Sequence, residues 1–152
     1  MTEPWDLPDR QIKVTMMLCD YAQVADGKMN VIGGGWTITG PQPAPFGIAL
    51  MLEVPWNQAD VEHTFRMELI DLDGAPVVPV GGEDPVVIEG QFEVGRPVDT
   101  EVRTPTALPF MAALNSAPLP LPPGGTYEWR LAIDGDTREE WRLPFSTRPA
   151  VV

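Results

Sequence analysis

Apolar and polar residues alternate with a period of two along most of the chain, which is the pattern of half-buried β-strands. The clearest case is 62–72, where Phe65, Met67 and Leu69 share one face and charged residues occupy the other. The same alternation or a short apolar run predicts strands at 13–21, 28–35, 46–56, 77–80, 86–94, 108–115, 127–133 and 141–145. The pattern predicts roughly seven to nine strands and no helix.

The last two predicted strands constrain their own pairing. Apolar residues occupy odd positions on both, so one shared core requires odd positions to pair with odd. A two-residue turn at Asp134-Gly135 would give the wrong parity. We therefore expect an odd-length loop with a bulge, which pairs Trp129 with Trp141 and Tyr127 with Leu143.

Each amphipathic strand needs an apolar partner layer, so we expect an all-β fold with two packed antiparallel sheets. The prediction is one β-sandwich domain over 11–148, immunoglobulin-like or C2-like, with an N-terminal arm at 1–10 and a C-terminal tail at 149–152. A closed β-barrel is the alternative. The segment 13–21 is apolar on both faces, which places it near the centre of a sheet, in a hairpin with 28–35 across an Asp-Gly turn.

Composition narrows the class of protein. The chain has 152 residues, with 18 Pro and 14 Gly, and this content disfavours a helix bundle. The 22 acidic and 10 basic residues give a net charge of −12, which argues against nucleic-acid binding. No apolar run approaches the ~20 residues that span a bilayer, and the N-terminus lacks the features of a secretory signal. We expect a cytoplasmic protein without a membrane partner.

Two segments carry a family resemblance. Leu18 to Trp36 reads LCDYAQVADGKMNVIGGGW and Gly124 to Asp136 reads GGTYEWRLAIDGD. They resemble the opening and closing hairpins of a family of small bacterial proteins of unknown function. The resemblance implies an immunoglobulin-like or C2-like sandwich, and it implies no activity, ligand or functional residue.

Enzymatic sites have weak support. His63 is the only histidine, and a catalytic interpretation would pair it with Ser116 or Ser146. Its place on an apolar face favours a buried, hydrogen-bonded histidine. The single cysteine, Cys19, lies in an apolar strand beside Asp20, which favours an inert buried thiol. One Cys and one His exclude the usual zinc site, and one Cys excludes an intramolecular disulfide.

Calcium is the best cofactor alternative, although no cofactor is expected. The candidate ligands are two Asp pairs beside glycines: Asp71, Asp73, Asp134 and Asp136. Turn chemistry accounts for the same residues, since Asp hydrogen-bonds nearby backbone before Gly. The run Gly33 to Gly35 is similarly ambiguous. It suits a phosphate cradle less well than a bend where another segment approaches closely.

Two surface features point to partners. The outward positions of two strands carry acidic residues, which form either a solvated face or a docking surface for a basic partner: Glu62, Glu68, Glu89 and Glu93. The segment 117–125, APLPLPPGG, is either a stiff crossing between strands or a ligand for a proline-recognising domain.

The favoured hypothesis is a non-enzymatic protein-interaction or structural module, a subunit of a homo-oligomer or of a larger assembly. It rests on apolar positions that the sandwich core does not use, including Met51, Met111 and one face of 13–21. The alternatives are a calcium- or small-ligand-binding sandwich and, less favoured, a carbohydrate-active enzyme with a carboxylate pair in one cleft.

Overall fold

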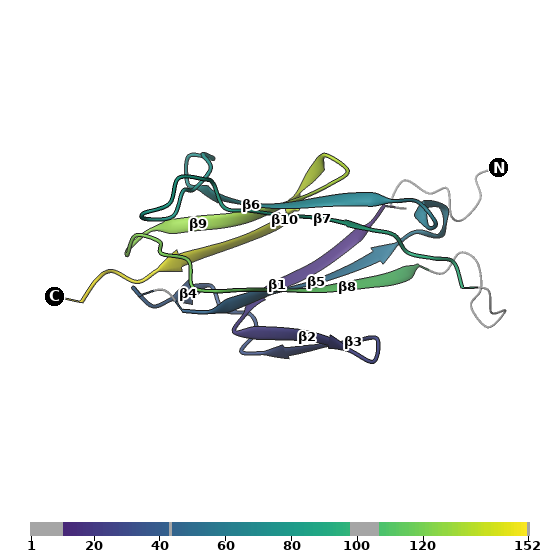
Figure 1. Ribbon diagram of the computed structural model, residues 1–152, viewed down its shortest axis with the longest axis horizontal. Helices are drawn as coiled ribbons and strands as arrows, with labels where there is room; N and C mark the ends of the chain where they lie inside the picture. Colours follow the sequence, from purple (N-terminus) through teal and green to yellow (C-terminus); the bar gives the residue numbers. More distant parts are fainter. Residues whose placement is uncertain (1–10, 43, 98–106, 152) are drawn as a thin grey trace.

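The computed structural model describes residues 11–42, 44–97 and 107–151, and these form ten strands and one turn of 3-10 helix (Figure 1). The elements in chain order are β1 (Lys13–Cys19), β2 (Tyr21–Ala25), β3 (Lys28–Ile32), β4 (Ile38–Thr39), β5 (Phe46–Val54), η2 (Trp56–Gln58), β6 (His63–Asp71), β7 (Val87–Phe92), β8 (Leu108–Ser116), β9 (Thr126–Ile133) and β10 (Asp136–Thr147). The predicted arm at 1–10 and the last residue of the predicted tail at 149–152 lie outside the described residues.

Two sheets face each other across the core, which confirms the all-β sandwich prediction. The smaller sheet has the order β1-β5-β8 and the larger one β4-β10-β9-β6-β7. Both contribute fully buried side chains to one core: Leu18, Ile48, Leu50, Leu52, Met67, Leu69, Trp129 and Leu131. The closed-barrel alternative is wrong, because the described strands form separate sheets that keep their edges.

A third layer covers the outside of the smaller sheet. The hairpin of β2 and β3 folds back beneath β1, β5 and β8 (Figure 1). Its Ala22 packs with Cys19 and Ala49 in a second small core. In the order β1-β5-β8, β1 is an edge strand, so the prediction that it lies near the centre of a sheet was wrong. Its second apolar face is covered by a hairpin that follows it in the chain, not by neighbouring strands of its own sheet.

Strand boundaries explain why ten strands form where about seven to nine were expected. The segment 13–21 splits at Asp20 into β1 and β2, and the two-residue β4 was not predicted. β4 pairs in parallel with β10 at one edge of the larger sheet. The predicted strand at 77–80 forms no strand; this region contributes an isolated bridge between Ile70 and Pro76.

The β9–β10 hairpin keeps the predicted parity by a different route. A two-residue turn does form, because Asp134 and Gly135 adopt positive φ values of 52° and 83°. The ladder then breaks between Thr137 and Arg142, and this bulge restores odd-with-odd pairing. Leu143 pairs with Trp129 and Phe145 with Tyr127. The bulge was predicted correctly. The odd-length loop was wrong, and the predicted register differs from the observed one by two residues.

The segment 117–125 crosses from β8 in the smaller sheet to β9 in the larger sheet. Leu119 and Leu121 pack against the main core. The crossing interpretation of APLPLPPGG is therefore correct. No helix in the described part of the chain is long and apolar enough to cross a membrane.

Candidate binding pocket

A pocket of about 340 Å³ opens at one end of the sandwich, between the two sheets. Its floor comes from Phe46 of β5, Trp129 of β9 and Phe145 of β10. The loop around β4 and the 117–125 crossing form its sides, with Trp36, Ile38, Gly40, Pro41, Pro45, Leu119 and Leu121. The pocket exists because the chain crosses this end with stiff, proline-containing segments that do not fill the gap between the sheets.

Aromatic rings fix the shape of the pocket. Trp36 and Phe145 meet edge-to-face at 84°, with ring centroids 5.8 Å apart. Phe46 lies tilted on Trp129 at 6.1 Å. Trp129 is 1% exposed, and its indole Nε1 is buried with no hydrogen-bond partner among the described residues. The result is a recess built around packed aromatic rings, with Thr39, Gln42 and Thr147 among its polar lining residues, and its aromatic part suits an apolar group.

The glycine run beside the pocket acts as a bend. Gly33 has φ 63° and packs against the side chain of Asp20, while the amide of Gly35 donates to Leu18 O at 2.7 Å. A Cβ on Gly34 would lie 2.7 Å from Val31 and 2.8 Å from Met17. Close approach of other segments thus accounts for Gly33 and Gly34, as the bend interpretation predicted, and a positive φ of 87° accounts for Gly35.

The rim of the pocket carries opposite charges and leads onto an apolar surface. Asp20 and Arg148 are the charged side chains among its lining residues. Directly beyond Asp20 and Gly33, the paired residues Tyr21 and Ile32 are 49% and 64% exposed. Ile38, in the pocket wall, is 54% exposed. Exposed apolar side chains of the β2–β3 hairpin therefore adjoin two lining residues of the recess in the chain.

His63 is the first residue of β6, and both nitrogens of its ring have a hydrogen-bond partner. Its Nδ1 is 2.7 Å from Asp134 Oδ2, and its Nε2 is 2.8 Å from Gln58 O. Phe92 stacks on the ring at 5.1 Å. The imidazole is 5% exposed, which agrees with the buried-histidine interpretation.

The pKa values of this pair shift in opposite directions. Burial alone would lower the pKa of His63, but its hydrogen bond to Gln58 O and the hydrogen bond and charge of Asp134 outweigh burial and raise it. For Asp134, burial alone would raise the pKa. Hydrogen bonds from His63 and the Thr64 amide, together with the imidazolium charge, lower it instead.

The two serines proposed as nucleophiles do not approach His63. Ser146 pairs with Thr126, and Ser116 with Phe46, at the pocket end of the sandwich. β6 carries His63 at its start, and its far end, Asp71, pairs with Tyr127. The length of β6 therefore separates the histidine from both hydroxyls. Asp20 is the single carboxylate among the described residues that line the pocket, so this part of the lining shows no carboxylate pair of the kind that a glycosidase uses.

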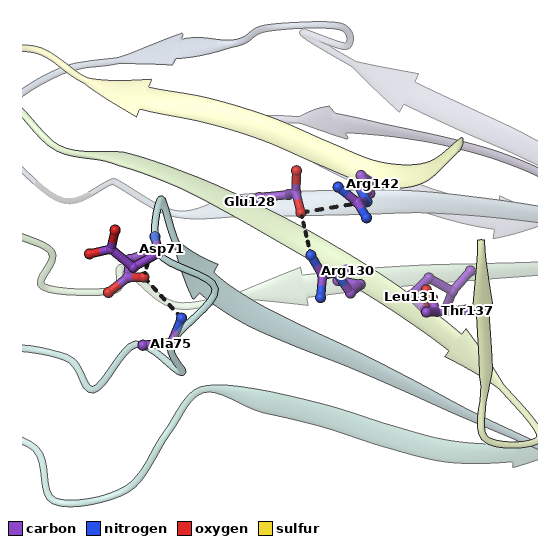
Figure 2. A network of polar contacts seen from close by, with 8 residues as sticks. Asp71, Ala75, Glu128, Arg130, Leu131, Thr137 and Arg142 are labelled. Atoms are coloured by element: carbon purple, nitrogen blue, oxygen red, sulfur yellow. Dashed lines mark hydrogen bonds and ion pairs between the residues drawn. The ribbon is translucent and has the colours of Figure 1, made fainter. Parts of the chain in front are cut away.

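The calcium candidates are divided between two places. Asp71 lies at the end of β6 near the pocket, and Asp134 bonds Thr64 at the start of β6. Asp71 Oδ1 accepts the amides of Asp73 and Ala75, which is turn chemistry (Figure 2). Within 11–42, 44–97 and 107–151, no group of three or more His, Cys, Asp or Glu side chains is arranged to hold a metal ion.

Cys19 is fully buried between the smaller sheet and the β2–β3 hairpin. Burial raises the pKa of its thiol, and the neighbouring Asp20 raises it further. These shifts disfavour the thiolate, so the geometry gives the thiol the character of a packing group.

The outward face of the larger sheet mixes acidic and basic residues. Arg66 pairs with Glu68 and Glu89. Arg130 and Arg142 are cross-strand neighbours, and Glu128 lies within 3.4 Å and 3.8 Å of their side chains (Figure 2). Arginine side chains thus lie among the acidic residues of this outward face. This mixture of charges favours the solvated-face interpretation of Glu68 and Glu89.

The pocket was missed by sequence reasoning. Its lining comes from separate segments, and its aromatic residues Phe46, Trp129 and Phe145 fit the pattern of ordinary core strands. The nearest signal was the pair of Pro-rich crossings at 41–45 and 117–125, which both border the recess.

The fold and the recess define an all-β, two-sheet sandwich with an apolar pocket at one end. The chain belongs to a Family of unknown function (DUF6941), whose model matches residues 14–146. Both segments that carry the family resemblance fall within this range. A comparison with curated proteins found no match.

Proposed function

We propose that this chain is a non-enzymatic protein-interaction module that anchors an apolar segment of a protein partner in the end pocket. The observation that carries the proposal is the exposure of Ile38, which lines the recess, together with that of Tyr21 and Ile32, which adjoin the lining residues Asp20 and Gly33 in the chain. A small ligand would leave these side chains in water, whereas a polypeptide covers both the recess and the surface beside it.

A hetero-assembly fits the charge better than self-association. Two copies would bring together net charges of −12 each, and like charges oppose association. The proposed setting is therefore a larger assembly in the cytoplasm. The bacterial origin implied by the family resemblance is part of this proposal. Light scattering across a wide concentration range tests the homo-oligomer version, and we expect a monomer.

The absence of an enzymatic role is also part of the proposal. His63 is engaged at both nitrogens and lies far along β6 from Ser116 and Ser146. Among the residues that the structure describes, the pocket lining offers one carboxylate, Asp20. Calcium binding is not favoured by any grouping of Asp71, Asp73, Asp134 and Asp136 in the described chain.

The test is a variant that fills the pocket without disturbing the fold. Gly40 lines the recess, and a Cβ there meets nothing within 4 Å. Gly40→Trp should fill the recess and abolish capture of the partner from the host. The matched control is Gly95→Trp, because Gly95 follows β7 at the His63 end and is also open to solvent. Equal capture by both variants and the wild type would overturn the proposal.

A further inference from the structure

We infer that the segment held in the pocket is an extended, basic peptide with a proline or leucine as its apolar anchor. This inference rests on the proposed function and specifies its partner. It comes from the walls of the recess, from the position of β4 at the edge of the larger sheet among the described strands, and from the net charge of the chain.

The walls suit a compact apolar side chain. The perpendicular rings of Trp36 and Phe145 form a corner, and Leu119 and Leu121 lie among the other lining residues. Aromatic surfaces of this kind recognise proline-containing extended segments, whose backbone entropy is already low. A volume of about 340 Å³ is near the lower end for ligand pockets, so it holds an anchor and not a folded partner.

The edge of the larger sheet favours an extended backbone. β4 is the terminal strand in the order β4-β10-β9-β6-β7, and Ile38 and Thr39 both line the recess. An extended segment that lies along β4 can add main-chain hydrogen bonds to the sheet while one side chain enters the pocket. Exposed Tyr21 and Ile32 lie beyond the rim and offer further apolar contact.

The net charge of the chain indicates which residues should flank the apolar anchor of the peptide. The negative charge of Asp20 and the positive charge of Arg148 cancel among the described lining residues, so these residues give the pocket no net charge. The whole chain carries −12, and this field attracts a basic segment and repels an acidic one. Flanking arginines or lysines are therefore expected, with Asp20 as the acidic group at the rim itself.

Three synthetic peptides test the inference on the full chain. One has a Pro-Leu-Pro centre with arginines on both sides, the second replaces the arginines with glutamates, and the third replaces the centre with serines. Binding is followed by NMR through the amides of Ile38 and Gly40 and the indole N–H of Trp129. We expect the arginine peptide to bind at least ~10-fold more tightly than the glutamate peptide, with this difference shrinking in high salt.

The serine peptide should show no saturable shift at Gly40, and Gly40→Trp should abolish binding of the arginine peptide while Gly95→Trp preserves it. Equal binding of the glutamate peptide would overturn the basic character of the partner. Equal binding of the serine peptide would overturn the apolar anchor. Failure of the arginine peptide also overturns this inference, but the proposed function survives it if Gly40→Trp still reduces partner capture. If neither peptide binding nor capture depends on Gly40, both proposals fail.

Discussion

His63 and Asp134 form a buried-to-surface ion pair, with Nδ1 and Oδ2 2.7 Å apart. Because Nε2 faces the carbonyl oxygen of Gln58, both ring nitrogens meet acceptors, and both contacts are satisfied together by the doubly protonated imidazolium. The pair joins η2 and the start of β6 to the tip of the β9–β10 hairpin, which lies 71 residues further along the chain.

This pair predicts that the free energy of unfolding is greatest between about pH 4 and 6.5. The pKa of His63 is raised from 6.5, so its contribution is complete below that pH and is lost as pH rises through the folded value. The pKa of Asp134 is lowered from 3.8, so its contribution is complete above that pH and is lost as pH falls through the folded value. Denaturant titrations across this range measure the effect, and a profile that rises steadily above pH 7 would contradict it.

Removal of the carboxylate charge should lower the pKa of His63. Asp134→Asn keeps an oxygen for the Thr64 amide but removes the charge, and we expect a loss of about 1–2 kcal/mol near pH 5.5, modest because the Asp134 side chain is 46% exposed. NMR titration of the imidazole measures the pKa. The control is Asp136→Asn at the same hairpin, which should leave it unchanged.

The amide of Asn115 should hold the β2–β3 hairpin against β8. Its Oδ1 accepts the Ala22 amide at 3.0 Å, and its Nδ2 donates to Ala22 O at 2.8 Å. Asn115→Ala should cost about 1–2 kcal/mol and loosen the hairpin locally. Because Cys19 lies beneath it, alkylation of the native thiol should accelerate. Asn30→Ala, on the exposed part of the hairpin, should leave the rate near that of the wild type.

Gly34 should tolerate no side chain. A Cβ there would lie 2.7 Å from Val31 and 2.8 Å from Met17, so Gly34→Ala should destabilise by about 1–3 kcal/mol as these neighbours shift. Gly40→Ala is the control, since its Cβ has open space. Thermal unfolding compares the two, and an equal effect would show that crowding at Gly34 is unimportant.

The carboxylates of Asp71, Asp73, Asp134 and Asp136 should not bind calcium. Asp71 and Asp134 are already engaged with backbone amides at opposite ends of β6. Calorimetry with millimolar calcium should give no binding heat, and the melting temperature should not change. A rise in melting temperature that Asp71→Asn or Asp134→Asn removes would restore the calcium hypothesis.

Local pattern predicted most of the strands. The shared inward face of Phe65, Met67 and Leu69 was correct, because alternation fixes which side chains can share a buried face. The pattern did not identify the neighbours of a strand where different arrangements produce the same sequence of apolar residues. Apolar residues on both faces of 13–19 indicate cover on both sides, but the covering layer can be a neighbouring sheet, another chain or, as here, the hairpin that follows.

The sequence by itself determined the all-β class, the odd-with-odd parity of the last hairpin and the turn role of its Asp-Gly pair, because alternation and backbone preference are local properties. Only the tertiary structure decided the rest. The hairpin beneath the smaller sheet, the meeting of His63 with Asp134 and the recess between Trp36 and Phe145 all join residues far apart in the chain. Their positions depend on how whole sheets pack, and no local pattern encodes that packing.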